Sequence, residues 1–369
     1  MMRIGLALIL TVFLTGCVSP PQILPLTAEL APGAELTEIL VATSRKPSAD
    51  PLVMFDSERS AALNFADIAV SVPPQRPLGK VVYPKNAPNP AKQFVPVRAT
   101  TGMARDQFLS RLNARLETLP REERIVFIFV HGYNTDFAEG LYRQVQIMHD
   151  FEVPGVAVNF SWPSAGKPAL YLYDRDSVEF ARDGLVETLR LAADSKAESI
   201  QLVGHSMGAL LTMKALRSLS EKRETAVLNR IRMLVLAAPD IDVDVFGLLL
   251  RDIDPLPANT AIFVSRKDRA LQASGRLRGG YPRVGQGGDI EDLRRAGITV
   301  LDLSGEDSPS DRLNHNTFAT SPTLIALARS GFLARESLKD DNAAEATLTA
   351  VSDLLAGIIY LPANAAGVR

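Results

Sequence analysis

Hydrophobic residues in the N-terminal part of the chain occur in short runs that are separated by turns rich in proline and glycine. The runs are EILVAT (38–43), DIAVSV (67–72) and KVVYP (80–84). Short β-branched runs that alternate with turn residues are typical of antiparallel strands at the edge of a sheet. We therefore expect such an edge at the N-terminal side of the fold.

Further along, continuous apolar runs alternate with segments of helical periodicity. The apolar runs are RIVFIFV (124–130), GVAVNFSW (155–162), SIQLVG (199–204), RMLVLAA (232–238), TAIFVS (260–265) and GITVLDL (297–303). The helical segments cover 107–119, 136–150, 174–193, 207–222 and 320–333. Apolar runs that alternate with helices indicate parallel strands buried on both faces. The pattern predicts an α/β fold with a mostly parallel, doubly wound sheet.

Composition narrows the function classes. The 369 residues are 46% hydrophobic and 22% charged, which excludes a chain that is disordered throughout. The formal net charge of -2 gives no basic excess, so we expect no nucleic-acid partner. No internal repeat interrupts the chain after residue 36. We expect one domain over 36–335, followed by a helical tail over 336–369.

The chain begins with a short apolar run that ends in its only cysteine, Cys17. Arg3 precedes an apolar stretch over 4–14 that is too short to span a bilayer, which is typical of an export signal. Leu14 to Cys17 resembles the lipobox of bacterial lipoproteins, which implies a signal peptide over 1–17 and a lipidated cysteine. A plain secretory signal is the alternative.

Two further expectations follow for the N-terminal region. A lone cysteine has no partner for a disulfide, which favours lipidation of Cys17 and a lipid anchor in the membrane. Val18 stands where aspartate would resemble an inner-membrane retention signal, so we expect an outer-membrane location in the envelope of a Gram-negative cell. Residues 18–35 contain four prolines and predict an extended tether.

The pentapeptide GHSMG (204–208) places Ser206 between two glycines. A strand-like run precedes it and a helix-patterned segment follows it, which is the context that a nucleophile elbow requires. In such an elbow the glycines leave room for a strained turn, and the hydroxyl stands at the N-terminus of the helix. An ordinary serine between two glycines is the alternative.

Seven phrases in order resemble the α/β-hydrolase superfamily and, within it, the bacterial group called domain of unknown function 900. They are VSVPPQRPLGKVVYP, FIFVHGYNTDF, FSWPSAGKPALYLYDRDS, LVGHSMGALL, LAAPDID, VSRKDRAL and LNHNTF, and they extend over residues 36–332. The resemblance implies an α/β-hydrolase fold. Only residues 241–259 join the phrase LVLAAPD to the run TAIFVS, which leaves little room for a large lid domain.

The resemblance also implies the chain order serine, acid, histidine. Among the four histidines, only His315 follows Ser206 in the chain, although it could be a surface-loop histidine. Asp268, after the run TAIFVS, is the favoured acid, and Asp240 is the alternative one strand earlier. Asp240 could instead cap the following helix, and Asp268 could be a solvated turn residue.

Acyl transfer also needs donors that point at the developing oxyanion. The expected donors are the backbone N–H of Met207 in the elbow and that of Tyr133 in the HGYN loop. Trp162, Tyr171 and Tyr173 could form a substrate pocket, or they could simply pack a loop.

The favoured function is therefore a lipid-anchored envelope serine hydrolase that cleaves small-molecule or lipid carboxylic esters through an acyl-enzyme. Thioester or amide hydrolysis by the same triad is one alternative, and a catalytically idle surface-binding lipoprotein is another. No cluster of residues has metal-ligand spacing and no loop is typical of phosphate binding, so neither a metal nor a cofactor is expected.

Overall fold

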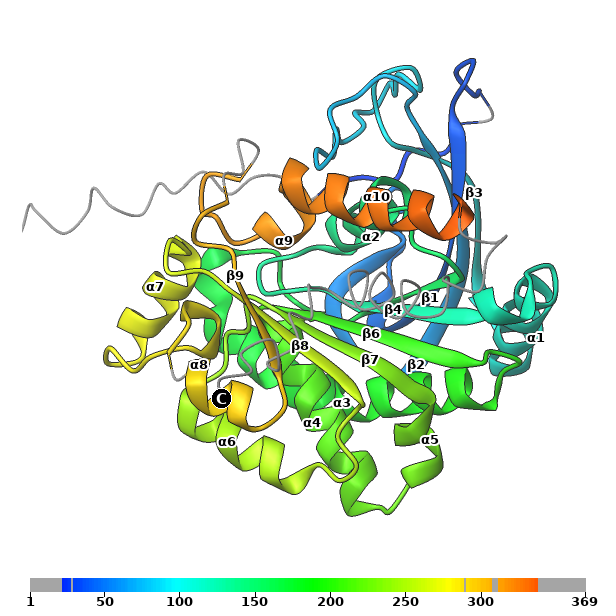
Figure 1. The fold of residues 1–369 in the computed structure, drawn as a ribbon. Helices are drawn as coiled ribbons and strands as arrows, with labels where there is room; N and C mark the ends of the chain where they lie inside the picture. Colours follow the sequence, from blue (N-terminus) through cyan, green and yellow to red (C-terminus); the bar gives the residue numbers. More distant parts are fainter. Residues whose placement is uncertain (1–21, 28, 289, 307–310, 338–369) are drawn as a thin grey trace, which may run out of the picture.

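The computed structural model of the chain describes residues 22–27, 29–288, 290–306 and 311–337 (Figure 1). Its strands are β1 Glu35–Pro47, β2 Phe55–Val72, β3 Val95–Met103, β4 Ile125–Val130, β5 Val156–Ser161, β6 Ser199–His205, β7 Ile231–Ala237, β8 Asn259–Val264 and β9 Thr299–Asp302. Its α-helices are α1 Arg105–Glu117, α2 Phe137–Asp150, α3 Tyr171–Asp194, α4 Met207–Glu221, α5 Thr225–Arg230, α6 Val243–Asp252, α7 Arg269–Leu277, α8 Ile290–Arg295, α9 Thr317–Thr320 and α10 Pro322–Ser337. Short 3₁₀ turns are η1 Arg121–Glu123, η2 Pro168–Leu170 and η3 Val284–Gln286. The predicted signal peptide, Cys17 and residues 338–369 of the predicted tail lie outside the described residues.

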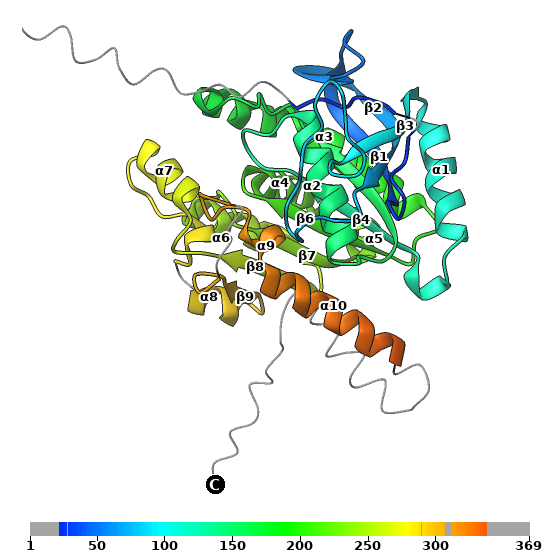
Figure 2. The same cartoon turned by 90° about the horizontal axis from the view of Figure 1, so that it is seen from above.

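The strands form one sheet in the order β3-β2-β1-β5-β4-β6-β7-β8-β9. β2 pairs antiparallel with both of its neighbours, whereas the pairs from β1 to β9 are parallel. This is the predicted α/β-hydrolase architecture, with an antiparallel edge at the N-terminal side of the sheet. Figure 1 shows α2, α9 and α10 on one face of the sheet and α3, α4, α5 and α6 on the other, and Figure 2 shows the same layers from above.

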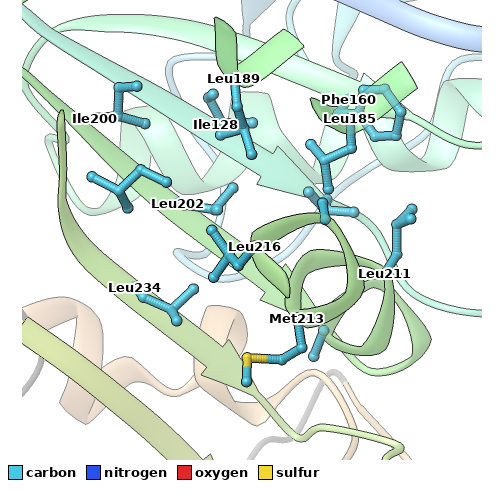
Figure 3. Close-up of a cluster of buried hydrophobic side chains, with 14 of the residues drawn as sticks. Ile128, Phe160, Leu185, Leu189, Ile200, Leu202, Leu211, Met213, Leu216 and Leu234 are labelled. Atoms are coloured by element: carbon cyan, nitrogen blue, oxygen red, sulfur yellow. The ribbon is translucent and has the colours of Figure 1, made fainter. Parts of the chain in front are cut away.

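Alternating side chains along each central strand supply two separate cores. In β4, Val126, Ile128 and Val130 pack on the face that α3 and α4 cover, whereas Phe127 and Phe129 pack on the face that α2 covers. Successive side chains of a strand point to opposite faces, so a strand that is buried on both faces must be apolar throughout. Figure 3 shows the first core, where residues of β4 and β6 meet leucines of α3 and α4.

One predicted strand is wrong. Residues 80–84 are irregular, and β3 occupies the edge position beside β2 instead. One backbone hydrogen bond joins this segment to Phe94, whose N–H donates to the carbonyl of Val82 at 3.0 Å. Pro84 has no amide hydrogen to donate, and a ladder along β2 needs a donor at alternate residues.

The predicted tether is also partly wrong. Leu24 is fully buried, and its N–H donates to the carbonyl of Leu52 at 2.7 Å. The carbonyl of Ile23 accepts from the Tyr142 hydroxyl, and the N–H of Gln22 donates to Asp136 Oδ2 at 2.7 Å. Residues 22–27 are therefore attached to the domain, because a buried leucine and paired backbone groups stabilise the segment against the sheet.

None of the helices within the described ranges is both long enough and apolar enough to cross a membrane.

Candidate active site

Ser206 occupies the turn between β6 and α4, with φ 54° and ψ -119°. Few residues other than glycine adopt such backbone angles, and strain of this kind persists only where the surrounding structure enforces it. Here the N–H of Ser206 donates to the carbonyl of Ala237 at 2.9 Å, and its own carbonyl accepts from Ala209 and Asp240. The side chain is almost enclosed, with 2% of the residue exposed.

The two glycines of GHSMG are required by close packing. A Cβ atom at Gly208 would lie 2.2 Å from the carbonyl oxygen of His131 and 2.5 Å from that of Val130. At Gly204 it would lie 2.6 Å from Thr212 Oγ1. Any larger side chain would push α4 away from β4 and β6. The sequence pattern thus reflects a direct contact between the helix and the two strands behind it.

His315 and Asp268 form a hydrogen-bonded pair. Nδ1 of His315 lies 2.7 Å from Asp268 Oδ2, and Asp268 is fully buried. Burial lowers the pKa of His315, but the charge of Asp268 and its hydrogen bond outweigh burial and raise the pKa above 6.5. The side chain of His315 is only 13% exposed. Neither residue is therefore the solvated surface group that the sequence left open.

Asp240 lies in a different set of contacts. Its carboxylate accepts from the Tyr171 hydroxyl at 2.8 Å and from Ser274 Oγ at 2.7 Å, and Nε of Arg283 lies 3.3 Å from it. It does not cap α6, because Asp242 accepts the N–H groups at the start of that helix. The first turn of α7 is capped by Asp268 itself, which accepts from Leu271 N–H at 2.9 Å.

His205 supports the loop that carries His315. Its Nε2 lies 3.0 Å from the carbonyl oxygen of His315, and its ring packs on Phe318 with centroids 4.9 Å apart. Burial and the neighbouring His315 hold the pKa of His205 well below its usual value, so the ring is neutral and donates this hydrogen bond. Sequence reasoning gave His205 no role, since nothing in GHSMG indicates which loop its side chain meets.

The HGYN loop passes directly over Ser206. A Cβ atom at Gly132 would lie 2.9 Å from Cβ of Ser206 and 2.8 Å from Nδ1 of His205, so only glycine fits. Among the described residues, no acceptor contacts the backbone N–H of Tyr133. The N–H of Met207 begins α4, where a helix has no internal acceptor. The structure thus brings both predicted donors to the two sides of Ser206.

A buried arginine holds the HGYN loop against the loop after β5. Arg45 donates to the carbonyls of Thr135 at 2.8 Å and of Ser164 at 3.0 Å, and burial lowers its pKa to about 10. Asp174 accepts from Asn134 N–H at 3.2 Å and from Ser164 Oγ at 2.6 Å. These contacts fix the loop that carries Tyr133. The sequence analysis missed Arg45 and Asp174. A single arginine in a β-strand or a single aspartate in a helix gives no indication that it is buried.

The three predicted pocket residues, Trp162, Tyr171 and Tyr173, lie in different surroundings, and only Tyr171 lies at the site. Trp162 is fully buried, stacks on His131 at 5.1 Å and donates to the carbonyl of His131, so it packs the core and does not line a pocket. Tyr173 packs toward β2, where the Arg59 guanidinium lies 4.4 Å from its ring centroid. Tyr171 does lie at the site, edge-to-face with Tyr133 at 5.2 Å. His131 is structural, because it is 1% exposed and its two ring nitrogens lie 2.9 Å from the carbonyl oxygen of Gly132 and 3.1 Å from that of Trp162.

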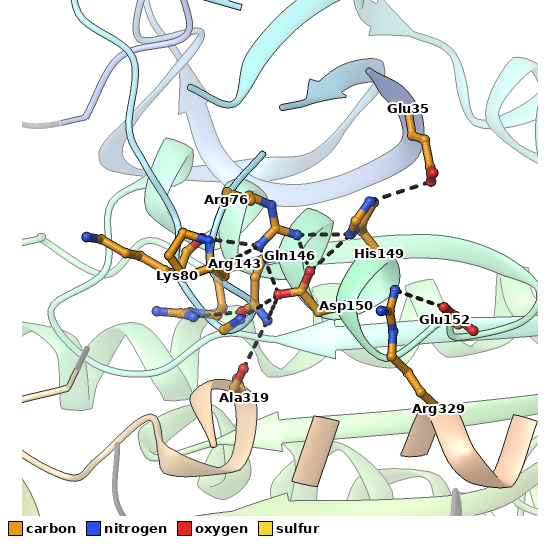
Figure 4. A network of polar contacts seen from close by, with 12 residues as sticks. Glu35, Arg76, Lys80, Arg143, Gln146, His149, Asp150, Glu152, Ala319 and Arg329 are labelled. Atoms are coloured by element: carbon orange, nitrogen blue, oxygen red, sulfur yellow. Dashed lines mark hydrogen bonds and ion pairs between the residues drawn. The ribbon is translucent and has the colours of Figure 1, made fainter. Parts of the chain in front are cut away.

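A polar network behind the site connects the loop 76–80 with α9 (Figure 4). Asp150 accepts from Arg76 Nη1 at 3.0 Å, from Gly79 N–H at 2.7 Å and from Gln146 Nε2 at 3.0 Å. The same Gln146 nitrogen donates to the carbonyl of Ala319 at 2.9 Å. Since α9 follows His315 directly, the network supports the loop that carries this histidine.

Among the described residues, no group of three histidine, cysteine, aspartate or glutamate side chains is placed to hold a metal ion. A surface cavity of about 260 Å³ lies elsewhere, between α3 and α4, and its lining residues include Arg182, Lys214, Arg217 and Glu221. None of these side chains belongs to the site around Ser206.

Comparison with known proteins gives one sequence match. The profile of the family described as alpha/beta hydrolase of unknown function (DUF900) matches residues 104–330, which include Ser206, Asp268 and His315. No curated protein matches the sequence.

Several solved structures are similar at low identity. They include fungal esterases from Rhizomucor miehei, with 14% identity, 82% of this chain and 85% of that chain covered and a TM-score of 0.34. A mutant of the esterase Est22 shows 15% identity, coverage of 82% and 81% and a TM-score of 0.39. The metagenomic carboxylesterase EstE1 shows 11% identity, coverage of 90% and 92% and a TM-score of 0.31. Neither the substrate nor the site residues of this chain follow from such distant likenesses.

Proposed function

The chain belongs to the DUF900 family of α/β hydrolases, and from this premise we propose that it is a serine hydrolase that cleaves carboxylic esters. Ser206 is the nucleophile, His315 the general base and Asp268 the residue that orients the base. The observation that carries the proposal is the strained backbone of Ser206 at the turn between β6 and α4. A strained serine is costly unless its position is used, and this turn presents its hydroxyl at a helix N-terminus.

The proposed chemistry is acyl transfer in two halves. Nε2 of His315 takes the proton of the Ser206 hydroxyl as Oγ attacks the ester carbonyl, and the tetrahedral oxyanion accepts hydrogen bonds from the N–H groups of Met207 and Tyr133. The imidazolium then gives its proton to the departing alcohol, which leaves an acyl-enzyme. In the second half, His315 takes a proton from water as the water attacks the acyl-enzyme. The imidazolium then returns the proton to Ser206 Oγ, and the carboxylic acid is released.

Asp268 has two roles in this proposal. Its hydrogen bond to Nδ1 fixes the tautomer of His315, so that Nε2 carries the lone pair that accepts the serine proton. Its charge also stabilises the imidazolium that forms during each half-reaction. Because the same carboxylate caps α7, the position of the acid is tied to the start of a helix.

A labelling experiment tests the proposal. A fluorophosphonate probe should form one covalent adduct with the wild-type protein, located at Ser206 by peptide mass spectrometry, and Ser206→Ala should abolish it. A panel of p-nitrophenyl esters of increasing acyl length, with matched thioester and anilide substrates, then identifies the bond that is cleaved fastest. Absence of labelling in a folded wild-type protein would instead favour a catalytically idle binding protein.

We further propose that a lipid on Cys17 anchors the protein in the outer membrane. The support is the lipobox-like sequence, together with the attachment of Gln22 to the domain. The five steps of the chain from Cys17 to Gln22 can reach at most about 18 Å at ~3.6 Å per step, so an anchored domain would stay close to the membrane surface. The N–H of Gln22 donates to Asp136, which follows the HGYN loop and caps the N-terminus of α2. The active-site edge would then be the part of the domain nearest the anchor.

Replacing Cys17 with alanine tests the anchor. The variant should accumulate as an unprocessed precursor and lose its outer-membrane fractionation, while wild type should carry a diacylglycerol mass at the mature N-terminus. An unchanged mature mass and unchanged fractionation of the variant would refute lipidation.

A further inference from the structure

A cluster of arginines surrounds Asp240, next to the proposed catalytic residues. Tyr171 on α3 and Ser274 on α7 both bond the carboxylate of Asp240, and their side-chain oxygens lie 3.0 Å apart. Each of these residues has an arginine four positions further along its helix, Arg175 on α3 and Arg278 at the end of α7. Residues four apart share a helix face. The two arginines therefore extend from a pair of side chains that are already in contact.

The third arginine of the cluster is Arg283, which is 1% exposed. Its Nε lies 3.3 Å from Asp240 and its Nη1 lies 3.8 Å from Asp242, but none of its three guanidinium nitrogens makes a hydrogen bond within the described residues. No other described arginine has all three nitrogens buried in this way. Asp240 and Asp242 thus pair with this guanidinium by charge, but its buried N–H donors make no hydrogen bond, which is costly and favours a further acceptor.

The charges of the cluster do not balance. The cluster holds three guanidinium groups and two carboxylates, those of Asp240 and Asp242, and only Arg283 pairs with them. Arg175 and Arg278 are half-buried and make no ion pair with any described residue, and one nitrogen of Arg278 is buried without a hydrogen bond. Burial lowers the pKa of Arg175, and the nearby charges of Arg278 and Arg283 lower it further. Such a group of cations favours an anion.

This cluster adjoins the reacting serine. The N–H of Asp240 donates to the carbonyl of Ser206 at 3.2 Å, and the ring of Tyr171 packs edge-to-face on Tyr133 in the HGYN loop. Arg283 directly precedes η3, and the N–H groups of Val284 and Gly285 donate to the carbonyls of Ile241 and Pro239 beside Asp240. The arginines thus lie beyond Asp240 and Tyr171 at the carboxyl end of the parallel sheet, where ligands bind in open α/β folds.

We propose that Arg175, Arg278 and Arg283 bind an oxyanion, a carboxylate or phosphate, that the ester substrate carries at a distance from the scissile bond. The proposal rests on the proposed function, because it names the substrate class of that site. Guanidinium groups recognise both anions through paired, charge-assisted hydrogen bonds. The site would then select charged esters over neutral esters of equal length.

A pair of substrates tests the selection directly. Wild type should hydrolyse mono-p-nitrophenyl glutarate, which carries a free carboxylate, with a kcat/KM at least ten-fold above that of neutral p-nitrophenyl valerate, and added salt should reduce the ratio. Arg175→Gln and Arg278→Gln should each lower this ratio about ten-fold, chiefly through KM. These two residues are preferable to Arg283, whose replacement deep in the structure could prevent folding.

Arg276→Gln is the matched control, because Arg276 lies on the same helix but is exposed. This change should leave the ratio as in wild type. If instead Arg276→Gln lowers the ratio as much as Arg278→Gln does, the effect is one of general surface charge and the proposal is wrong. A wild-type ratio near one, with efficient hydrolysis of the neutral ester, would also overturn it while leaving the proposed function intact.

Binding without catalysis separates the two anions. Isothermal titration of Ser206→Ala with glutarate and with inorganic phosphate should show binding of at least one of them, and the added change Arg175→Gln should abolish it. The stronger ligand identifies the group that the substrate carries. No binding of either anion would refute the anion site, even if wild type labels fully with the fluorophosphonate.

Discussion

At the scale of single residues, each proposed catalytic group is held by a partner that the mechanism does not consume. Ser206 is held by Ala237 and Asp240 through its backbone, and His315 is held by Asp268 through its ring and by His205 through its carbonyl. Catalytic groups must stay within a fraction of an ångström of the productive geometry. The supporting contacts are therefore as informative about function as the reacting atoms.

Replacing the two candidate acids should separate their roles. Asp268→Asn should lower kcat by about 10⁴-fold, because the tautomer of His315 and the charge beside it are both lost. Asparagine can still cap α7, so we expect little change in the melting temperature. Asp240→Asn should lower kcat far less, since Asp240 bonds Tyr171 and Ser274. Ester kinetics with thermal melting of both variants checks this, and the reverse order of effects would contradict it.

The pH dependence of activity follows from the raised pKa of His315. The base must be neutral to accept the serine proton, so kcat/KM should rise with pH and level off above an apparent pKa that is higher than 6.5. In Asp268→Asn the charge that raises this pKa is absent, and the residual activity should level off at lower pH. If kcat/KM rises over the same pH range in wild type and in Asp268→Asn, a group other than His315 controls the pH dependence.

At the scale of elements, the packing of α4 against β4 and β6 fixes the serine turn. Gly208 brings the first turn of α4 against the backbone at the end of β4, where the HGYN loop begins. The same contact therefore positions the serine, the helix N-terminus and the loop with Tyr133. A side chain at position 208 would therefore displace the serine, the helix N-terminus and the loop with Tyr133 together.

Gly208→Ala should therefore abolish ester hydrolysis and lower the melting temperature. The new Cβ would lie 2.2 Å from the carbonyl oxygen of His131 and 2.5 Å from that of Val130, which is the last residue of β4. Gly247→Ala is the control, because nothing lies within 4 Å of a Cβ there and the residue is inside α6. In that exposed helix, alanine should stabilise by about 0.4–1 kcal/mol. Retention of full activity by Gly208→Ala would contradict the packing argument.

At the scale of the whole molecule, the histidine loop depends on residues far from it in the chain. Arg76 and Gly79 lie between β2 and β3, Gln146 and Asp150 lie on α2, and Ala319 lies on α9. Their hydrogen bonds join three parts of the chain around one buried carboxylate (Figure 4). The side chains of Arg76 and Asp150 are almost wholly buried, so breaking this pair leaves a charge without compensation.

Asp150→Asn should lower the free energy of unfolding by about 3–5 kcal/mol, because Arg76 stays buried without its anion. Burial alone raises the pKa of Asp150, but hydrogen bonds from His149 and Arg76 outweigh it and lower the pKa to about 2. The carboxylate therefore stabilises the fold above its ordinary pKa of 3.8, and this contribution is lost as the pH falls toward about 2. The difference between wild type and variant should shrink over the same range.

The matched control is Asp183→Asn, which removes an ion pair to Arg182 on the exposed face of α3. Its effect should stay below about 1 kcal/mol, because solvent screens exposed pairs. Urea unfolding of both variants at pH 7 and at lower pH measures the comparison. Equal and small losses in the two variants would show that the network around Asp150 does not stabilise the fold.

The parallel strands β4 to β9, the helices α1 to α4 and α10, and the family followed from the sequence alone. The periodicity of apolar residues is a local property of the sequence. It is clearest in buried strands and long helices, because there the pattern repeats several times. The helices predicted over 136–150 and 207–222 agree with α2 and α4 to within one residue at each end. The strand over 80–84 failed and β3 was missed, because pairing at a sheet edge depends on the neighbour and not on local composition.

For the site, the sequence by itself determined the candidates, since GHSMG, the HGYN loop and the order serine, acid, histidine are local or ordinal features. Only the tertiary structure decided that Asp268 contacts His315 while Asp240 bonds Tyr171 and Ser274. It also removed Trp162 from the pocket and brought Arg45 under the loop. These contacts join residues far apart in the chain, and a hydrogen bond requires positions within about 3 Å that no pattern along the chain specifies.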